Sequence, residues 1–542
     1  MSVKITFLGG LGEIGRNCAA IEHDGKIALI DCGLMFPEAD MLGVDLVFPN
    51  WEWLIERKQD VECVIVTHGH EDHVGALAYF LKEFPGVPVY GTQLSVALAR
   101  GRVDEIGVEA EFIGCEDNRW IEHKPFGFMF VPVSHSIPQG AGIVFDTPEG
   151  FIVHSGDFKL DPTPVDGRPT DLQQFAHFGR EGVRLLMADS TNAEIPGFVP
   201  SETSLASEIG EIIAKAGGRV VAACFASHVH RVQQIADAGI AAGRTVAFAG
   251  RSMHRVSGVG TELGVLDIPA DKIVEIQELT KLPAKKQLLI TTGSQGEPFA
   301  ALSLMAAGRH KWVTLEPDDT VLISATPIPG NEAAVSKVIS KLNRTGARVY
   351  HGRNAKVHVS GHAARDELTT FLNVIRPKSF VPVHGEYRHL RAHAELADQM
   401  KVPDVNILED GDMIEIKGDR THVTNRAVDA SYVYFDGTGD VNNSVLRARG
   451  HLSDDGVVVV TVGVQRSDSS VILGPDIDSH GFADDPRRIL AKAAEAVRSA
   501  VTELDPQSEL GQYQKAVRLA AQQVIRAETS RKPVVIPVVL EV

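Results

Sequence analysis

The sequence predicts an α/β fold whose functional groups gather at one edge of a β-sheet, with a second α/β domain inserted into it and a small α+β domain at the C-terminal end. Three observations lead to this prediction. Residues 67–73 read Thr-His-Gly-His-Glu-Asp-His directly after the apolar run 61–66. Residues 200–350 follow a βαβ-like pattern, which is typical of a parallel sheet. Beyond about residue 450, strand patterns precede two long helical patterns, without a catalytic constellation.

Residues 68–73 carry a high density of metal-ligand side chains. They are His68, His70, Glu71, Asp72 and His73. The run 61–66 is a predicted buried strand and the amphipathic run 74–81 a predicted helix, so these side chains share one strand-to-helix turn. A single His-x-His is more often a satisfied or exposed pair than a metal site. Imidazole and carboxylate at this density suit zinc and have no packing role, so the sequence predicts a metal site.

One turn cannot complete two metal coordination spheres, so further ligands are expected at the ends of other strands. The candidates are Asp31, His135, Asp157 and His384, which follow the apolar runs 27–30, 128–134, 151–156 and 380–383. Taken singly, each is more easily interpreted as a strand-end loop residue. Their shared placement and ligand chemistry favour a common site at one sheet edge.

These residues resemble the metallo-β-lactamase family, an αββα sandwich with two zinc ions at one edge of its sheets. The matching residues are His68, His70, Asp72, His73, His135 and Asp157, preceded by Asp31. The resemblance implies that one zinc is held by His68, His70 and His135. It implies that the other is held by Asp72, His73 and His384, with Asp157 bridging the two. Asp31 then supports a ligand from behind, and Glu71 falls at a variable position and is no ligand.

Length and composition fit a multidomain enzyme of the cytoplasm. The chain of 542 residues is too long for one core, and its 44% hydrophobic and 23% charged content is ordinary for a globular protein. No apolar run approaches the ~20 residues that span a bilayer, so no membrane association is expected. The N-terminus lacks a secretory pattern, and the five cysteines form no close pair, which suits a reducing compartment.

The chain is predicted to divide at about residues 195, 365 and 447. Residues 1–195 and 366–447 form the two parts of the core, with hairpin turns at 24–25 and 148–150. Residues 196–365 form the inserted domain, with a capped helix beginning at Ser201 and strands at 219–224, 245–248, 287–290 and 320–323. Residues 448–542 hold strands at 457–462, 470–473 and 533–540 and helices near 486–504 and 510–528, with 447–455 as the connection. An assembly role is favoured for this last domain over a substrate-shaping one.

A metallo-β-lactamase core interrupted by an α/β domain resembles the β-CASP nucleases. The matching residues are Asp189, His362 and His384, and histidine at the last of these positions resembles the branch that acts on RNA rather than DNA. Within that branch, residues 9–17, 189–194 and 225–231 resemble the ribonuclease J family. The resemblance implies a 5′-to-3′ exoribonuclease of RNA maturation and decay that prefers 5′-monophosphate ends and also cuts internally. It implies two Zn²⁺ ions, with Mn²⁺ or Mg²⁺ as alternatives in the working enzyme.

The chemistry of the residues agrees with this activity. Paired metals lower the pKa of a bound water and stabilise the phosphorane oxygens. The candidate catalytic residues are Asp72, His362 and Asp189. His362 is expected either to orient a phosphate oxygen or to protonate the leaving 3′-oxygen, and Asp189 to hold His362 or a ligand in place.

A preference for a monophosphate requires a pocket of hydrogen-bond donors. The resemblance places it at Ser227, His228, Val229, His358, Val359, Ser360, Gly361 and His362. The alternative for residues 227–228 is the N-terminal cap of a helix near 230, and the alternative for His358 is a strand-end residue. Capping and phosphate binding use the same backbone N–H groups, so the two roles of residues 227–228 are compatible.

Other interpretations stay open. The net charge of −18 argues against a nucleic-acid partner, although net charge describes solubility better than it describes a cleft. A DNA nuclease is the first alternative, and a small-molecule metallo-hydrolase is a more remote one. The expected partners are single-stranded RNA, a second copy bound through the C-terminal domain, and an RNA-degrading complex.

Two local patterns are also open to more than one interpretation. Asp40, Asp45, Asp436 and Asp440 are either an additional cation site or solvated loop carboxylates. The glycine-rich run 9–15 follows a strand but precedes another strand, so it is not a dinucleotide loop.

Overall fold

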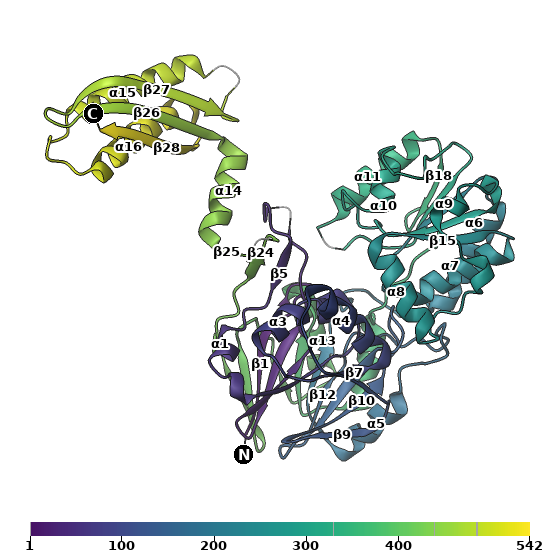
Figure 1. Ribbon diagram of the computed structural model, residues 1–542. Helices are drawn as coiled ribbons and strands as arrows, with labels where there is room; N and C mark the ends of the chain where they lie inside the picture. The colour runs from purple at the N-terminus through teal and green to yellow at the C-terminus, as the bar shows by residue number, and fades with distance from the viewer. Residues whose placement is uncertain (1, 39, 329, 438, 484–485, 542) are drawn as a thin grey trace. The chain divides into compact units, whose positions relative to one another are not determined.

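The structure, a computed structural model, describes residues 2–38, 40–328, 330–437, 439–483 and 486–541 (Figure 1). The chain divides into two compact units. The first contains Met1–Phe36 and Val47–Tyr432, and the second contains Pro37–Leu46 and Val433–Val542. None of the helices in the described part of the chain has the length and apolar character needed to cross a bilayer.

The core of the first unit is built from two β-sheets. The first sheet runs in the order β23 (Arg420–Thr424), β22 (Met413–Lys417), β1 (Val3–Gly9), β3 (Cys18–His23), β4 (Lys26–Ile30), β6 (Val61–Ile65), β7 (Val89–Thr92) and β8 (Phe112–Cys115). The second runs in the order β21 (Asp404–Val405), β19 (Ser379–Val383), β13 (Val183–Asp189), β12 (Phe151–His154), β11 (Ala141–Asp146), β10 (Phe126–Pro132) and β9 (Trp120–His123).

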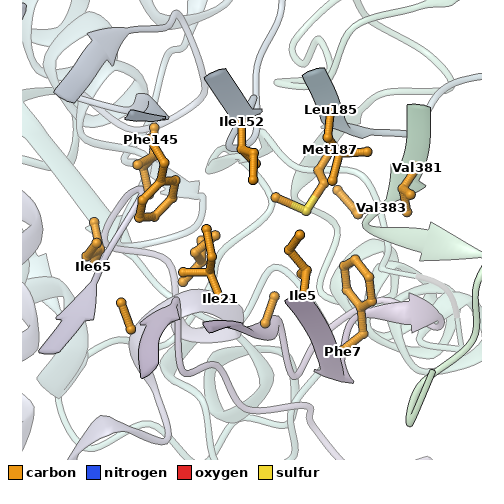
Figure 2. Close-up of a cluster of buried hydrophobic side chains, with 14 of the residues drawn as sticks. Ile5, Phe7, Ile21, Ile65, Phe145, Ile152, Leu185, Met187, Val381 and Val383 are labelled. Atoms are coloured by element: carbon orange, nitrogen blue, oxygen red, sulfur yellow. The ribbon is translucent and has the colours of Figure 1, made fainter. Parts of the chain in front are cut away.

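The two sheets bury one hydrophobic layer between them. Figure 2 shows Ile5 and Ile21 of the first sheet facing Ile152 and Leu185 of the second, and all four side chains are fully buried. Alternation of side chains along each strand sends every second residue into this layer. Each such side chain contributes about 1.5–3 kcal/mol of burial free energy, so the layer fixes the register of the strands whose ends carry the site.

Helices cover the outer faces of both sheets. Beside the first sheet lie α1 (Glu52–Ile55), α3 (Leu77–Glu83) and α4 (Gln93–Ile106) (Figure 1), and the short helix α2 (Glu71–Val74) precedes α3 in the chain. A second apolar cluster packs α5 (Leu172–Glu181), α12 (Arg365–Ile375) and α13 (Tyr387–Gln399) on the other sheet. The expected αββα sandwich is therefore confirmed.

The predicted helix over 74–81 is interrupted. Helix α2 ends at Val74 and α3 begins at Leu77. The backbone N–H of Ala76 donates to the carbonyl of Cys32 at 3.0 Å rather than to a helical partner. A Cβ at Gly75 would lie 2.5 Å from Leu34 Cγ. The turn therefore packs tightly against the strand-end loop that follows β4, which the helical periodicity does not reveal.

The inserted domain is a parallel sheet with helices on both faces, as the βαβ pattern predicted. Its strand order is β15 (Thr245–Ala249), β16 (Gln287–Thr291), β14 (Val220–Ala223), β17 (Thr320–Ile323) and β18 (Arg348–His351). One face is covered by α6 (Ala206–Lys215), α7 (Val229–Ala241) and α8 (Arg251–Glu262). The other is covered by α9 (Ile276–Leu279), α10 (Ala301–Ala306) and α11 (Glu332–Arg344).

The insertion leaves and re-enters the core at one sheet edge. Strand β13 precedes it and β19 follows it, and these two strands pair in parallel with Asp189 opposite Val383. The carboxyl ends of paired parallel strands lie at the same edge of a sheet. Asp189 and His384 are therefore brought side by side although about two hundred residues separate them in the chain.

Among the described residues of the second unit, two helices pack on one face of a three-stranded sheet. The strands are β27 (Ser470–His480), β26 (Val457–Gln465) and β28 (Val534–Glu541), and the helices are α15 (Arg487–Thr502) and α16 (Leu510–Thr529). The predicted strands and helices of this region are confirmed.

Residues 447–455, expected as a plain connection, belong to helix α14 (Asn443–Asp455). This helix begins at Asn443 because the Asn442 side chain accepts the N–H groups of Ser444 and Val445. The unit also contains the short strands β24 (Val433–Phe435) and β25 (Asp440–Val441). The domain boundaries at 195, 365 and 447 stay predictions.

Candidate metal centre

The predicted ligands converge into two clusters that share Asp157. The first cluster contains His68, His70, His135 and Asp157, and the second contains Asp72, His73, Asp157 and His384. In each cluster, one potential ligand atom from every residue lies within 4.8 Å of the others. Asp157 Oδ2 lies 3.6 Å from His68 Nε2 and 3.5 Å from His384 Nε2. All seven predicted ligands therefore meet at one place in the fold.

Strand ends deliver these groups, and two of the strand-end residues have an unusual backbone. Asp31, after β4, and His384, after β19, have φ values of 60° and 54°, in the left-handed region that few non-glycine residues adopt. Their backbone N–H groups donate to the carbonyls of Ile65 at 3.0 Å and Gly10 at 3.1 Å, respectively. Such strain persists where the surroundings fix it, and it turns both side chains toward the centre.

The ring nitrogens of the first cluster are arranged for a cation. His70 Nδ1 lies 3.0 Å from His68 Nε2 and 3.2 Å from His135 Nε2. The Nδ1–H of His135 donates to the carbonyl of Gly361 at 2.8 Å, which leaves the Nε2 lone pair facing the centre. Three nitrogens that meet in this way, beside a carboxylate, fit a divalent ion of the zinc type.

Hydrogen bonds behind the ligands fix their orientation. Asp31 Oδ2 accepts from His73 Nδ1 at 2.7 Å and from Thr67 Oγ1 at 2.8 Å. With its proton committed to Asp31, Thr67 Oγ1 lies 3.0 Å from His68 Nδ1 and can only accept from it. Asp31 therefore contacts one predicted ligand directly and reaches another through Thr67, and its supporting role at the metal site stays a prediction.

His384 is oriented in the same manner by Thr191. Thr191 Oγ1 donates to Asp189 Oδ1 at 2.8 Å and accepts from His384 Nδ1 at 2.7 Å. This leaves Nε2 of His384 directed at the second cluster, 3.3 Å from Asp72 Oδ2. Neither threonine was singled out from the sequence. Their only sequence signal is position, since Thr67 precedes His68 and Thr191 follows Asp189 by two residues.

The protonation tendencies differ between the clusters. Burial lowers the pKa of His70 to about 4 and also lowers the pKa values of His68 and His135, so these imidazoles are neutral, as ligation requires. For His384, burial is outweighed by Asp157, Asp72 and Asp189, and the pKa rises to about 9. The second cluster is thus the more carboxylate-rich environment, and it stabilises positive charge.

His362 lies at the edge of the centre and is paired with Asp189. Its Nδ1 lies 2.8 Å from Asp189 Oδ2 and 3.9 Å from Asp157 Oδ2. Asp189, His362, His384 and Asp157 form a third group of potential ligands. Burial lowers the pKa of His362, but Asp189 outweighs it and the net direction is upward. The expected link between Asp189 and His362 is therefore present.

Glu71 points away from both clusters. Its carboxylate pairs with Arg102 Nε at 3.3 Å and with Arg255 Nη2 at 3.3 Å. Arg102 belongs to α4 and Arg255 to α8, so Glu71 connects the ligand turn to the inserted domain. Among the residues that the structure describes, Asp40, Asp45, Asp436 and Asp440 join no group of potential metal ligands.

The residues predicted to bind a 5′-phosphate lie beside the centre on two segments. His228 is the N-cap of α7, where its side chain accepts from the N–H of Arg231. Asn192 Nδ2 donates to Ser360 Oγ and to the carbonyl of His362, both at 2.8 Å. A Cβ on Gly361 would lie 2.8 Å from the His135 ring, so only glycine lets this segment approach the ligand. Ser227 precedes the cap, Val229 opens the helix, and buried Val359 anchors the second segment.

The fold and the centre together define a metallo-hydrolase of the metallo-β-lactamase superfamily with a β-CASP insertion. Comparison with known families agrees segment by segment. Residues 11–195 match the "Metallo-beta-lactamase superfamily", and residues 217–342 match "Ribonuclease J, beta-CASP domain". Residues 347–407 match the "Zn-dependent metallo-hydrolase RNA specificity domain", and residues 444–542 match the "Ribonuclease J C-terminal domain".

The chain belongs to the ribonuclease J family of metal-dependent RNA nucleases. It is 40% identical to Ribonuclease J of Mycolicibacterium smegmatis over 546 residues, which cover 100% of this chain and 97% of that protein. It is 40% identical to Ribonuclease J 1 of Streptococcus pyogenes (99% and 97% covered) and 38% identical to Ribonuclease J2 of Bacillus subtilis (100% and 99% covered). A crystal structure of a protein of unknown function from Enterococcus faecalis shares the fold at 17% identity, with a TM-score of 0.54 over 77% of this chain and 100% of that one. The ribonuclease J family indicated by the resemblance is confirmed.

Proposed function

We propose that this protein is a zinc-dependent phosphodiesterase that degrades single-stranded RNA from a 5′-monophosphate end in the 5′-to-3′ direction and also cuts RNA internally. The observation that carries the proposal is the meeting of two ligand clusters at Asp157, beside the His362–Asp189 pair and the two candidate phosphate-binding segments. A small-molecule hydrolase would require neither the inserted domain nor these segments.

Two zinc ions fit the donor set of the centre. His68, His70, His135 and Asp157 would hold one ion, and Asp72, His73, His384 and Asp157 would hold the other. When bound, paired zinc ions supply a hydroxide at neutral pH and neutralise charge on the phosphate oxygens. Imidazole with carboxylate is the donor chemistry that zinc prefers over magnesium. Manganese is the alternative, and elemental analysis of the purified protein distinguishes the two.

The residues of this chain perform the remaining tasks. Asp72 is the most exposed member of the second cluster, with 30% of its side chain accessible, so it is placed to accept a hydrogen bond from the attacking water. Asp189 fixes the His362 ring through Nδ1, so His362 is placed to protonate the leaving 3′-oxygen or to orient a phosphate oxygen. Replacement of His362 with alanine should lower kcat far more than it lowers zinc content.

The 5′-phosphate pocket is proposed at residues 227–229 and 358–362. The N-terminus of α7, capped by His228, presents a partial positive charge to an anion. Among the described side chains, His358 Nδ1 is buried without a hydrogen-bond partner, which leaves it for a ligand. Burial, helped by Arg231, lowers the pKa of His358 to about 3, so this ring is neutral in the free protein.

The second unit is proposed to form a homodimer through its sheet. Ile536, Val538 and Leu540 alternate along β28, and they are 45%, 37% and 46% exposed. Val535 and Val539, at the alternate positions of the strand, are buried under the helices, so the exposed residues share the uncovered face. An apolar row of this kind is typical of an interface. Val538→Asp should shift the sedimentation coefficient from dimer to monomer, and an unchanged coefficient would refute this dimer.

All five cysteines are free, which supports the proposed cytoplasmic location.

The decisive test of the activity uses single-stranded RNA labelled at its 5′ end, prepared as the monophosphate and as the triphosphate. We expect early release of labelled mononucleotide, faster from the monophosphate and abolished by a chelator. Internal fragments alone would replace the exonuclease by an endonuclease. An absence of cleavage by protein with two metals bound per chain would refute the proposal.

A further inference from the structure

The two segments of the proposed phosphate pocket are tied together by one buried side chain, Arg231 of α7. Arg231 lies within three residues of His228, and its own backbone N–H donates to the His228 side chain. Its Nη1 donates to the carbonyl of Val357 at 2.7 Å, the residue that precedes His358. One guanidinium therefore reaches from the first segment to the second, across 126 residues of sequence.

The Val357 carbonyl receives a second anchor. Ser324, at the end of β17, donates its hydroxyl to this carbonyl at 2.6 Å and also accepts from Arg231 Nη1. The strand end of the inserted sheet, the helix that opens the pocket and the segment leading to His358 thus meet at one carbonyl. Displacing Arg231 would leave Ser324 alone to hold this carbonyl and would remove the direct link between the two segments.

Glu202 holds Arg231 from the other side. Its carboxylate accepts from Arg231 Nη2 and lies 3.2 Å from His228 Nε2 and 4.0 Å from Lys159 Nζ. Its backbone N–H donates to Asp161 at 3.0 Å, and Lys159 pairs with Asp161 at 3.3 Å. Lys159 and Asp161 belong to the core, so this carboxylate also secures the pocket to the metal-bearing domain.

We propose that Arg231, held by Glu202, is the positioning residue that sets the spacing of the two pocket segments and thereby the preference for a 5′-monophosphate. This inference rests on the proposed function. Arg231 is fully buried, and its guanidinium donates to Gln234, Ser324, Val357 and Glu202. It therefore does not touch the RNA. It acts through His228 and His358, which border the pocket.

The test replaces Arg231 with lysine. Arg231→Lys keeps the positive charge beside Glu202 but cannot bridge Ser324, Val357 and Glu202 together, because an ammonium lacks the planar fork. The matched control is Arg244→Lys in the same inserted domain. Arg244 is also buried, and it donates to the carbonyls of Gly218, Gln287, Ile213 and Ala216, at the opposite ends of the strands.

The readout is the ratio of kcat/KM on 5′-monophosphate RNA to kcat/KM on 5′-triphosphate RNA. Hydrolysis of bis(p-nitrophenyl) phosphate, which has no 5′ end, and zinc content serve as references for the metal centre. In Arg231→Lys we expect the RNA ratio to fall by about tenfold or more, the change that 1.4 kcal/mol produces. The fall should appear mainly in KM for the monophosphate, while both references hold. Arg244→Lys should lower the melting temperature but keep the RNA ratio.

The outcomes separate the two levels of inference. An unchanged ratio in folded, zinc-loaded Arg231→Lys would overturn the positioning role alone. A wild-type protein that degrades both RNAs equally would overturn the pocket itself, and this inference with it. If Arg231→Lys does not fold, Ser324→Ala removes one anchor of the Val357 carbonyl and should shift the ratio in the same direction by a smaller factor. An unchanged ratio there would equally overturn the role.

Discussion

Asp31 offers the sharpest test of how the centre is built, because it contacts no other predicted ligand than His73. Its carboxylate accepts from His73 Nδ1 at 2.7 Å and from the N–H and hydroxyl of Thr67, each at 2.8 Å. Asparagine at this position has one acceptor oxygen instead of two. In Asp31→Asn, the amide N–H therefore faces either the backbone N–H of Thr67 at Oδ1, or both His73 Nδ1 and the Thr67 hydroxyl at Oδ2.

The expected magnitude follows from this geometry. Loss of a hydrogen bond that orients a ligand costs about 10–100-fold in metal affinity. That factor corresponds to about 1.4–2.7 kcal/mol. His73 belongs to the second cluster, whereas the first cluster is reached only through Thr67 and His68. The loss should therefore fall mainly on one of two binding steps.

The assay is a titration of metal-free protein with zinc in competition with a chromophoric chelator, which resolves two steps. The control is Asp319→Asn, a buried aspartate of the inserted domain that accepts the backbone N–H groups of Arg219 and Glu316. We expect Asp31→Asn to weaken one step by 10–100-fold, as estimated above, and Asp319→Asn to change neither. Two equally weakened steps, or none, would refute the assignment of Asp31 to His73.

Three further predictions follow from local geometry. Gly361→Ala should displace His135, because the new Cβ would lie 2.8 Å from its ring. The variant should lower kcat/KM on a small phosphodiester by up to about 100-fold, and wild-type activity would contradict this contact. Burial and a neighbouring carboxylate raise the pKa of Asp410 to about 8. The free energy of unfolding, measured by urea denaturation, should therefore fall as the pH rises through about 6–8, and Asp410→Asn should reduce this pH dependence. Arg255→Gln removes a partly exposed ion pair with Glu71 and should lower the free energy of unfolding by less than about 1 kcal/mol. A loss above about 3 kcal/mol would show that the pair behaves as a buried ion pair.

The sequence could place the candidate ligands at strand ends because those signals are local, whereas their assignment to two metal ions came from the resemblance to the metallo-β-lactamase family. His68, His135, Asp157 and His384 follow apolar runs that form strands, and strands in a sheet end at a shared edge. The βαβ pattern of the insertion and the C-terminal elements were predictable for the same reason. For these strands and helices, the periodicity within a short window carried the prediction.

What the sequence could not show depends on contacts between distant segments. Arg231 and Glu202, which lie 29 residues apart in the chain, look like unrelated surface charges until the fold buries both. Thr67 and Thr191 acquire a role only because an aspartate and a histidine ring stand on either side of each hydroxyl. The break at Gly75 depends on Leu34 from another loop. Side-chain type alone carries no trace of such partners.

The acidic composition of the chain has a local counterpart at the centre. The net charge is −18, and Asp72, Asp157 and Asp189 add three carboxylates where the scissile phosphate must lie. Behind the pocket, the charges of Lys159 and Arg231 are offset by Asp161 and Glu202, so that network contributes little net attraction. Two divalent ions would add four positive charges beside these three carboxylates. In a protein of this charge, attraction of RNA to the cleavage site should therefore increase with metal loading.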